Sequence, residues 1–442
     1  MDQSKIEKRA INKMTWRLMP FCIFLYIVNI IDRGNLGFTA LDMNAALGIE
    51  AAAFGLLTSI FFIGYFFLEV PSNMAMHRFG AKLWIGRIMI TWGLVTCGVF
   101  FAQSFTHVAI LRFLLGVCEA GFFPGMIYYF TFWFPMRYRA RITSIFFIAG
   151  PIAAAIGAPI STLIMDHVSW LGQDGWRWVY MLEGIAAVVG GIFCFIYLTD
   201  KPQDAKWLTQ EEKDWVVNEI AAEDAMKTET AHFTLGKVFK YGKVWRLAFI
   251  YMFIQITTQA LSFWSPTLVK EFSAAFSNTT VGFIMMLPPI VGLIAMLYWG
   301  KHSDQKGERV KHTALPMIVF VLALGLMMAP GIPMKLIGLT LTGVASYSFY
   351  GPYWAIPTIY LSGEAAAIGV AIINSMSSFG GFAGNLAVGF IKESILGTTG
   401  VFVFLLLCAL IAFFMTITLK MQKQEKLKEI KSDTEQPAES IV

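Results

Sequence analysis

The stretch LMPFCIFLYIVNIIDRGNLGF, residues 18–38, decides the kind of fold that this chain adopts. It is a long apolar run, and about 20 such residues in a helix cross the hydrocarbon core of a membrane. Two adjacent charges, Asp32 and Arg33, nevertheless lie in its second half. A charged side chain at the centre of a bilayer costs about 2.5–3.5 kcal/mol, so such residues normally face the protein interior and mark a pathway or a proton relay.

The composition of the whole chain is that of a membrane protein. Hydrophobic residues make up 57% and charged residues 14%, whereas soluble domains carry about 25% charged residues. Apolar windows long enough to span a membrane begin near residues 18, 52, 83, 107, 141, 178, 244, 280, 313, 336, 364 and 397. We therefore predict an all-α integral membrane protein with twelve transmembrane helices in two six-helix bundles.

One polar stretch divides the two sets of windows. It predicts an N-terminal bundle at 1–199, a cytoplasmic linker at 200–243, a C-terminal bundle at 244–420 and a disordered tail at 421–442. Within the linker, Thr209 and Glu212 have the spacing of a capping box, which starts a helix. The partial apolar stripe that follows fits a helix lying on the membrane surface, or equally a solvated connector without function.

The distribution of Lys and Arg predicts the orientation. Basic residues collect on the cytoplasmic side of membrane proteins. The N-terminus, the linker, the tail and alternate loops hold most of them, while the opposite side holds only Arg177, Lys270, Lys335 and Lys392. We expect both termini in the cytoplasm. The net charge of +5 then reflects topology and not affinity for nucleic acid.

Two further charges, Arg112 and Glu119, lie in the fourth apolar window. Asp32 is about 21 Å along a helix that enters near Leu18, and Arg112 is about five residues from the opposite face. Both therefore lie at a similar depth in the outer half of the membrane, which allows an ion pair. Glu119 is about two turns deeper on the face of Arg112, near the midplane.

These four charges could form a proton switch. A carboxyl group inside a membrane is kept neutral by desolvation or ionised by a neighbouring guanidinium. We expect Asp32 and Glu119 to exchange protons while Arg112 pairs with Asp32 in one conformation and releases it in another. Arg33 is the expected ligand of an anionic substrate, because its planar fork of donors fits a carboxylate. The alternative is a fixed network that aligns helices.

The remaining titratable residues point to no other chemistry. Glu69 and Glu183 lie near the ends of their spans and receive no role. The cysteines fall inside apolar spans, so a disulfide framework is not expected. We find no metal cluster, nucleophile triad or phosphate loop, and we expect neither a cofactor nor an enzyme.

Proline and glycine pairs predict irregular helices. Gly150–Pro151 should break the fifth span, and Gly351–Pro352 together with Pro357 should break the tenth, because proline removes a helical hydrogen bond. Broken segments of this kind often line or hinge the binding cavity of a transporter.

Several motifs resemble the anion:cation symporter branch of the major facilitator superfamily. They are IIDRGNLGF (30–38), LRFLLGVCEAGFFPGMIYYFTFWFP (111–135), RYRAR (137–141) and GWRWVYMLEG (175–184). The similarity covers nearly the whole chain and is greatest to members that take up tartrate, rhamnonate, phthalate or 4-hydroxyphenylacetate with protons. Gly300–Asp304 and Gly307–Arg309 match the cytoplasmic gate motif of the superfamily, whereas the corresponding loop of the first half has His77 where the motif has Asp.

The resemblance implies roles for individual residues. The coupling acids fall on Asp32 and Glu119, and the arginines on Arg33 and Arg112. Pocket positions match Tyr65, Trp354 and Asn374. Two positions depart from the sugar-acid members, which have Tyr at Ile30 and Gln at Gly150. Polar side chains of the second bundle are nevertheless numerous enough to bind the hydroxyls of a smaller acid: Gln255, Thr258, Gln259, Tyr350, Asn374, Ser375 and Ser378.

The expected function is proton-coupled import of a small organic carboxylate, by rocking of two bundles about a midplane site. The substrate would be a hydroxy acid such as tartrate, a sugar acid or an aromatic acid. Alternatives are an organic anion exchanger and a ligand sensor that retains the transporter fold. Expected partners are the organic anion, protons and membrane lipid, in a bacterial inner (plasma) membrane. We expect a monomer that binds no nucleic acid.

Overall fold

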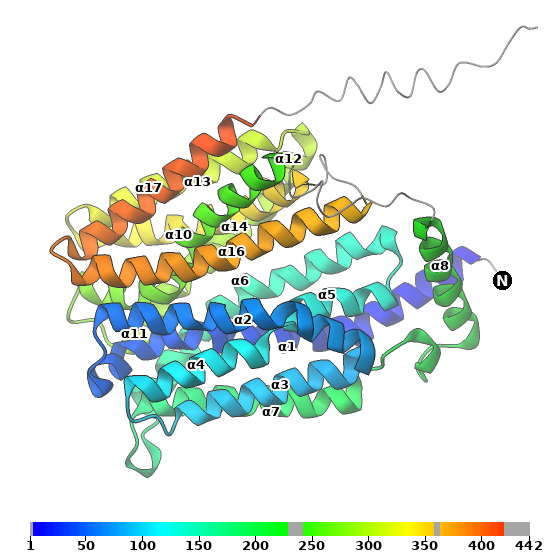
Figure 1. The fold of residues 1–442 in the computed structure, drawn as a ribbon, viewed down its shortest axis with the longest axis horizontal. Coiled ribbons are helices and arrows are strands. Elements are labelled where there is room, and N and C mark those ends of the chain that lie inside the picture. Colours follow the sequence, from blue (N-terminus) through cyan, green and yellow to red (C-terminus); the bar gives the residue numbers. More distant parts are fainter. Residues whose placement is uncertain (1–2, 229–241, 358–362, 420–442) are drawn as a thin grey trace, which may run out of the picture.

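The computed structural model describes residues 3–228, 242–357 and 363–419, which are almost entirely helical (Figure 1). The first half contains α1 (Gln3–Leu47), α2 (Ala51–Phe79), α3 (Ala81–Val99), α4 (Phe105–Glu119), α5 (Phe122–Trp133), α6 (Met136–His167) and α7 (Gly175–Tyr197). Short 3₁₀ turns η1 (Trp170–Gly172) and η2 (Pro202–Asp204) flank α7, and α8 (Gln210–Thr228) follows. The second half contains α10 (Gly242–Phe272), α11 (Asn278–Met285), α12 (Leu287–Lys306), α13 (Val310–Met328), α14 (Ile332–Ala355), α16 (Gly363–Glu393) and α17 (Gly397–Ile417).

The helices form two bundles with the same internal arrangement, α1–α7 and α10–α17 (Figure 1). In the first bundle α1 packs on α6, α2 on α4 and α3 on α7. In the second bundle α10 packs on α16, α12 on α14 and α13 on α17, which are the corresponding pairs six spans later. The two bundles meet where α2 packs on α16, α1 on α10, and α6 on α11 and α12.

The predicted fold class is confirmed. Among the described residues, nine segments are long and apolar enough to cross a membrane, with α4–α5 and α11–α12 each taken as one segment. The helices α3, α14 and α16 fall outside that criterion but occupy the three remaining predicted spans. Residues 229–241 of the predicted linker and the predicted disordered tail lie outside the described residues.

The predicted break at Gly150–Pro151 is absent, and the break of the tenth span lies at Pro357, as predicted, but not at Gly351–Pro352. Helix α6 continues through Pro151, and α14 continues through Gly351–Pro352 to end at Ala355, just before Pro357. The chain also breaks between α4 and α5, where Gly121 has φ 89°, and at Met286, which precedes a Pro-Pro pair at the start of α12. A proline in the interior of a helix is tolerated in a bundle where neighbouring groups satisfy the freed carbonyl.

Acidic side chains join the two bundles at the end of the molecule remote from α8, which we call the far end. Asp166, near the end of α6, accepts hydrogen bonds at 2.7 Å from the backbone N–H and the hydroxyl of Thr279 in the first turn of α11. Glu393, at the end of α16, accepts one at 2.8 Å from the N–H of Ala52 in the first turn of α2. The two contacts correspond in the two halves, and each places an anion at a helix N-terminus. Asp42 adds a third contact, to Asn278 at 2.9 Å.

The helix α8 is docked on the first bundle at the opposite end, which we call the linker end (Figure 1). The predicted capping box is confirmed, since the N–H of Thr209 donates to Glu212 at 2.9 Å. Glu212 also accepts from Lys13 of α1 at 2.8 Å, and Arg137 at the start of α6 pairs with Glu219 at 2.6 Å. Burial raises the pKa of Glu212, but these hydrogen bonds outweigh it and keep the pKa below its usual value. Ion pairs thus attach α8 to α1 and to the start of α6.

Candidate functional site

The break between α4 and α5 positions Glu119. Gly121 adopts a positive φ, and a Cβ atom there would collide with the side chain of Ser72 on α2, so the position requires glycine. Glu119 consequently becomes the last residue of α4, inside the bundle. The partial negative charge at a helix C-terminus disfavours a carboxylate. An ionised Glu119 therefore depends on donors from other helices.

Helix α1 supplies those donors. Oε1 of Glu119 accepts hydrogen bonds from Nε of Arg33 and, at 2.7 Å, from Nδ2 of Asn29, which is one turn earlier on the same face of α1. The side chain of Glu119 is 1% exposed, whereas that of Arg33 is 33% exposed. The guanidinium is thus the more accessible partner of the pair, and the acid is the buried one.

Asp32 is buried beside this pair but bonds to other groups. Its carboxylate accepts from Thr96 Oγ1 at 3.2 Å and from Asn35 Nδ2 at 3.4 Å. Arg112 is buried too, and its Nε and Nη1 have no hydrogen-bond partner in the described part of the chain. The predicted Asp32–Arg112 ion pair is thus not formed in this conformation. Neighbouring residues of a helix point about 100° apart, so only one member of the Asp32-Arg33 pair faces Glu119.

Aromatic rings of α2 hold the two arginines close together. The ring of Phe61 lies 5.1 Å from Cζ of Arg33 and 5.4 Å from Cζ of Arg112. The ring of Tyr65, one turn further on, lies 4.9 Å from Cζ of Arg33. These cation–π contacts hold two positive groups beside one ring, and only Arg33 is engaged in an ion pair, with Glu119. The arrangement suits an anion.

Polar residues of the second bundle form a cluster around Gln255 of α10. Its Oε1 accepts from Thr258 at 2.8 Å and from the hydroxyl of Tyr350 at 3.2 Å, and its Nε2 donates to Ser377 at 3.1 Å. Gln259 lies one turn further along α10 and is half-buried. Donors and acceptors of this kind bind hydroxyl groups.

The other predicted pocket residues of the second bundle are less engaged. Trp354 is half-buried, and its ring meets that of Tyr251 edge-on at 5.2 Å. Asn374 on α16 is exposed. The structure therefore brings Arg33, Glu119 and Tyr65 together. Trp354 and Asn374 lie on the second bundle, and within the described part of the chain they make no hydrogen bond to these three residues.

Sequence reasoning missed several residues of this site. Asn29, Phe61 and Thr96 contact the charged groups but were not proposed. Glu183, which was given no role, is buried and accepts a hydrogen bond from Ser161 at 2.7 Å. The polar residues of the first span recur every three or four positions within an apolar run, and this spacing was the available signal.

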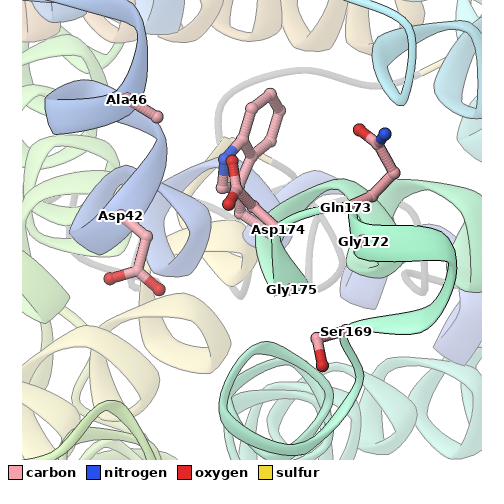
Figure 2. Close-up of a pocket in the computed structure, with 8 residues that line it drawn as sticks. Asp42, Ala46, Ser169, Gly172, Gln173, Asp174 and Gly175 are labelled. Atoms are coloured by element: carbon pink, nitrogen blue, oxygen red, sulfur yellow. The ribbon is translucent and has the colours of Figure 1, made fainter.

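An open cavity of about 470 Å³ lies elsewhere, at the far end of the first bundle (Figure 2). It is lined by Asp42, Ala46, Ser169, Gly172, Gln173, Asp174, Gly175 and Trp176. It lies between the end of α1 and the start of α7, away from Arg33. In the described residues no group of three His, Cys, Asp or Glu side chains is placed to hold a metal ion.

Comparisons with known proteins agree with this architecture. The model of the Major Facilitator Superfamily matches residues 22–385 and 276–441. A protein named "Putative tartrate transporter" from Agrobacterium vitis is 43% identical over 90% of this chain and 91% of its own. A quinolone resistance transporter from Acinetobacter baumannii is 36% identical over 88% of this chain and 89% of its own. The inward open conformation of the E. coli xylose transporter XylE has a TM-score of 0.74 at 15% identity, over 94% of this chain and 99% of that one.

The family match spans most of the chain, and the two relatives named above are transporters, which confirms the predictions of a transporter and of a protein that is not an enzyme. This chain belongs to the Major Facilitator Superfamily, among its permeases of the anion:cation symporter type.

Proposed function

We propose that this transporter imports a small hydroxy carboxylate, with tartrate as the first candidate, together with protons across a bacterial inner membrane. The observation that carries the proposal is the accessible guanidinium of Arg33 paired with a buried acid at a helix end, Glu119. The name of the Agrobacterium relative supports the substrate class. The distribution of Lys and Arg supports an orientation with the linker end in the cytoplasm.

Competition for Arg33 would couple the two cargoes. A substrate carboxylate that binds the guanidinium displaces the carboxylate of Glu119. Glu119 then lies at the C-terminus of α4 with Asn29 as its remaining hydrogen-bond donor, and binding a proton removes its unfavourable charge. Anion and proton thus bind together. Arg112 is the second group available to the anion. Its Nε and Nη1 have no hydrogen-bond partner among the described residues, and its Cζ lies 5.4 Å from the centre of the Phe61 ring, which Arg33 also contacts.

The second bundle would select the rest of the substrate. Gln255, Thr258 and Tyr350 already form one hydrogen-bonded cluster. Hydroxyl groups of the substrate can therefore find hydrogen-bond partners there when they leave water. Aromatic acids are a second candidate class, because the rings of Phe61 and Tyr65 flank Arg33.

Import of an anion needs an additional driving force. Moving one negative charge inward against a membrane potential costs about 2.3 kcal/mol per 100 mV, and co-entry of a proton offsets it. The described acid contacts between the bundles, at Asp166, Glu393 and Asp42, would close the outer face in this conformation. Breaking them is the step that opens the site outward.

Uptake of radiolabelled tartrate into proteoliposomes tests the proposal. An acidic exterior should drive accumulation, and a protonophore should abolish it. The variant Arg33→Gln should lose uptake, while Arg9→Gln, an exposed arginine at the linker end, should retain it. Unlabelled phthalate in competition ranks the aromatic class against tartrate.

The alternatives give different results. An exchanger would take up tartrate only against an internal anion, and a sensor would bind tartrate without accumulating it. Tartrate accumulation that ignores the pH gradient would refute proton coupling.

A further inference from the structure

Two polar stripes face each other along α1 and α7, which pack together. Their members recur every three or four residues and therefore lie on one face of each helix. On α1 the stripe consists of Asp32, Asn35, Thr39 and Asp42, and on α7 of Trp176, Tyr180 and Glu183. Polar groups aligned inside a membrane bundle are costly and typically mark an ion or proton pathway.

The stripes begin at the open cavity of the far end (Figure 2). Asp42 and Trp176 line that cavity. One turn deeper, the hydroxyls of Thr39 and Tyr180 share a hydrogen bond at 2.8 Å. Trp176 packs edge-on against Tyr180, with ring centroids 6.4 Å apart. The open cavity thus lies at the outer end of the polar column, and the hydroxyl pair separates it from the deeper groups in this conformation.

Glu183 lies next in the column. It is 7% exposed, and its Oε1 accepts from Ser161 of α6 at 2.7 Å, while its Oε2 has no partner among the described residues. Asn35 lies one turn from Thr39 on α1, and its Nδ2 donates to Asp32 at 3.4 Å, so it continues the column from the Thr39–Tyr180 pair to Asp32. Glu183 is about 12 Å from the start of α7, whereas Glu119 is about 21 Å from the start of α4, so Glu183 is the shallower acid.

We propose that Glu183 is a proton carrier on the outer side of Asp32, loaded from the far-end cavity and emptied into Asp32. The inference rests on the proposed function, since it adds the group that receives protons from outside. In the transfer the O–H bond of the Glu183 carboxyl breaks and an O–H bond forms on the Asp32 carboxylate. The pair keeps one proton and one negative charge throughout.

The surroundings of Glu183 favour one shared proton. Asp32 faces it from α1 and Cys97 faces α7 from α3, while α6 contributes the neutral Ser161. No ion pair to Glu183 occurs in the described part of the chain. The cations nearest to the pair, Arg33 and Arg112, lie on the side of Asp32 and not of Glu183. A second negative charge at Glu183 is therefore disfavoured in a medium of low dielectric constant, so a single proton is shared between the two carboxyl groups.

The variant Glu183→Gln tests this role. Glutamine keeps the shape and can still accept from Ser161, but it cannot release a proton. Its rate of tartrate uptake driven by a pH gradient should fall about tenfold or more and lose its dependence on external pH. Tartrate counterflow, which needs no net proton movement, should stay within about twofold of the wild-type rate. Glu183→Asp should restore part of the gradient-driven rate. The matched control is Glu50→Gln, an exposed glutamate at the same end.

Each outcome has a distinct meaning. Normal gradient-driven uptake by Glu183→Gln would overturn the inference while leaving the proposed function intact. An equal loss of counterflow and gradient-driven uptake would assign Glu183 to structure or substrate binding, and a thermal shift with tartrate would identify a variant that does not fold. If the wild-type protein ignores the pH gradient, the proposed function itself fails.

Discussion

Because Arg33 and Glu119 form an ion pair, we predict that substitutions at the two positions have non-additive effects on the free energy of unfolding. Removing one partner of a buried ion pair costs about 3–5 kcal/mol, because the other charge is left uncompensated. The guanidinium of Arg33 is one-third exposed, so solvent screening reduces the expected cost of Arg33→Gln to about 2 kcal/mol. Adding Glu119→Gln removes the stranded charge. The double variant should therefore be more stable than Arg33→Gln alone.

Thermal or denaturant unfolding of the purified protein in detergent measures this double-mutant cycle. The expected coupling energy is about 2 kcal/mol. The control cycle uses Arg137→Gln and Glu219→Gln, an ion pair at the linker end whose side chains are 48% and 30% exposed. Its coupling should stay below about 1 kcal/mol. Additive effects at Arg33 and Glu119 would refute the argument that these two charges depend on each other.

Three further predictions concern the contacts at the far end, the docking of α8 and the substrate. Combining Asp166→Asn with Glu393→Gln removes the anions from two helix N-termini, so the bundles should separate at the far end; unchanged spin-label distances between α6 and α11 would contradict this. The lowered pKa of Glu212 means that its carboxylate stabilises the docked α8 above pH 4.5, and this contribution is lost as pH falls through the lower folded-state pKa. Hydrogen exchange of α8 should therefore rise in that pH range in the wild type and in the control Glu211→Gln. In Glu212→Gln the exchange should already be raised at neutral pH and should not rise further. Gln255→Leu should raise the KM for tartrate about tenfold with little change for acids that lack hydroxyl groups; equal effects on both classes would exclude a role in hydroxyl recognition.

The fold was predictable because membrane solvation leaves few options. Apolar windows identify the helices without knowledge of packing, and alternating basic loops predict their orientation. The buried charges Asp32, Arg33, Arg112 and Glu119 were predictable for the same reason, since each is expensive in a membrane unless it faces the bundle interior.

The pairing of those charges was not predictable from spacing. Depth along a helix gives the level of Asp32 and Arg112 but not the direction in which they point, and the direction makes Arg33 the partner of Glu119. The break at Gly121 was not predictable either, because a single glycine inside an apolar run does not reveal whether it adopts a positive φ. The position of Glu183 near a span end predicts contact with the interface, whereas packing of α7 against α1 and α6 buries it.

Proton uptake on substrate binding tests the competition for Arg33 most directly. Purified protein in weakly buffered solution, with a pH-indicator dye, would be mixed with tartrate at neutral pH. The displaced Glu119 should take up about one proton per tartrate bound, and Glu119→Gln should bind tartrate without that uptake. Tartrate binding with no proton uptake by the wild-type protein, or with the same uptake by Glu119→Gln, would contradict the mechanism.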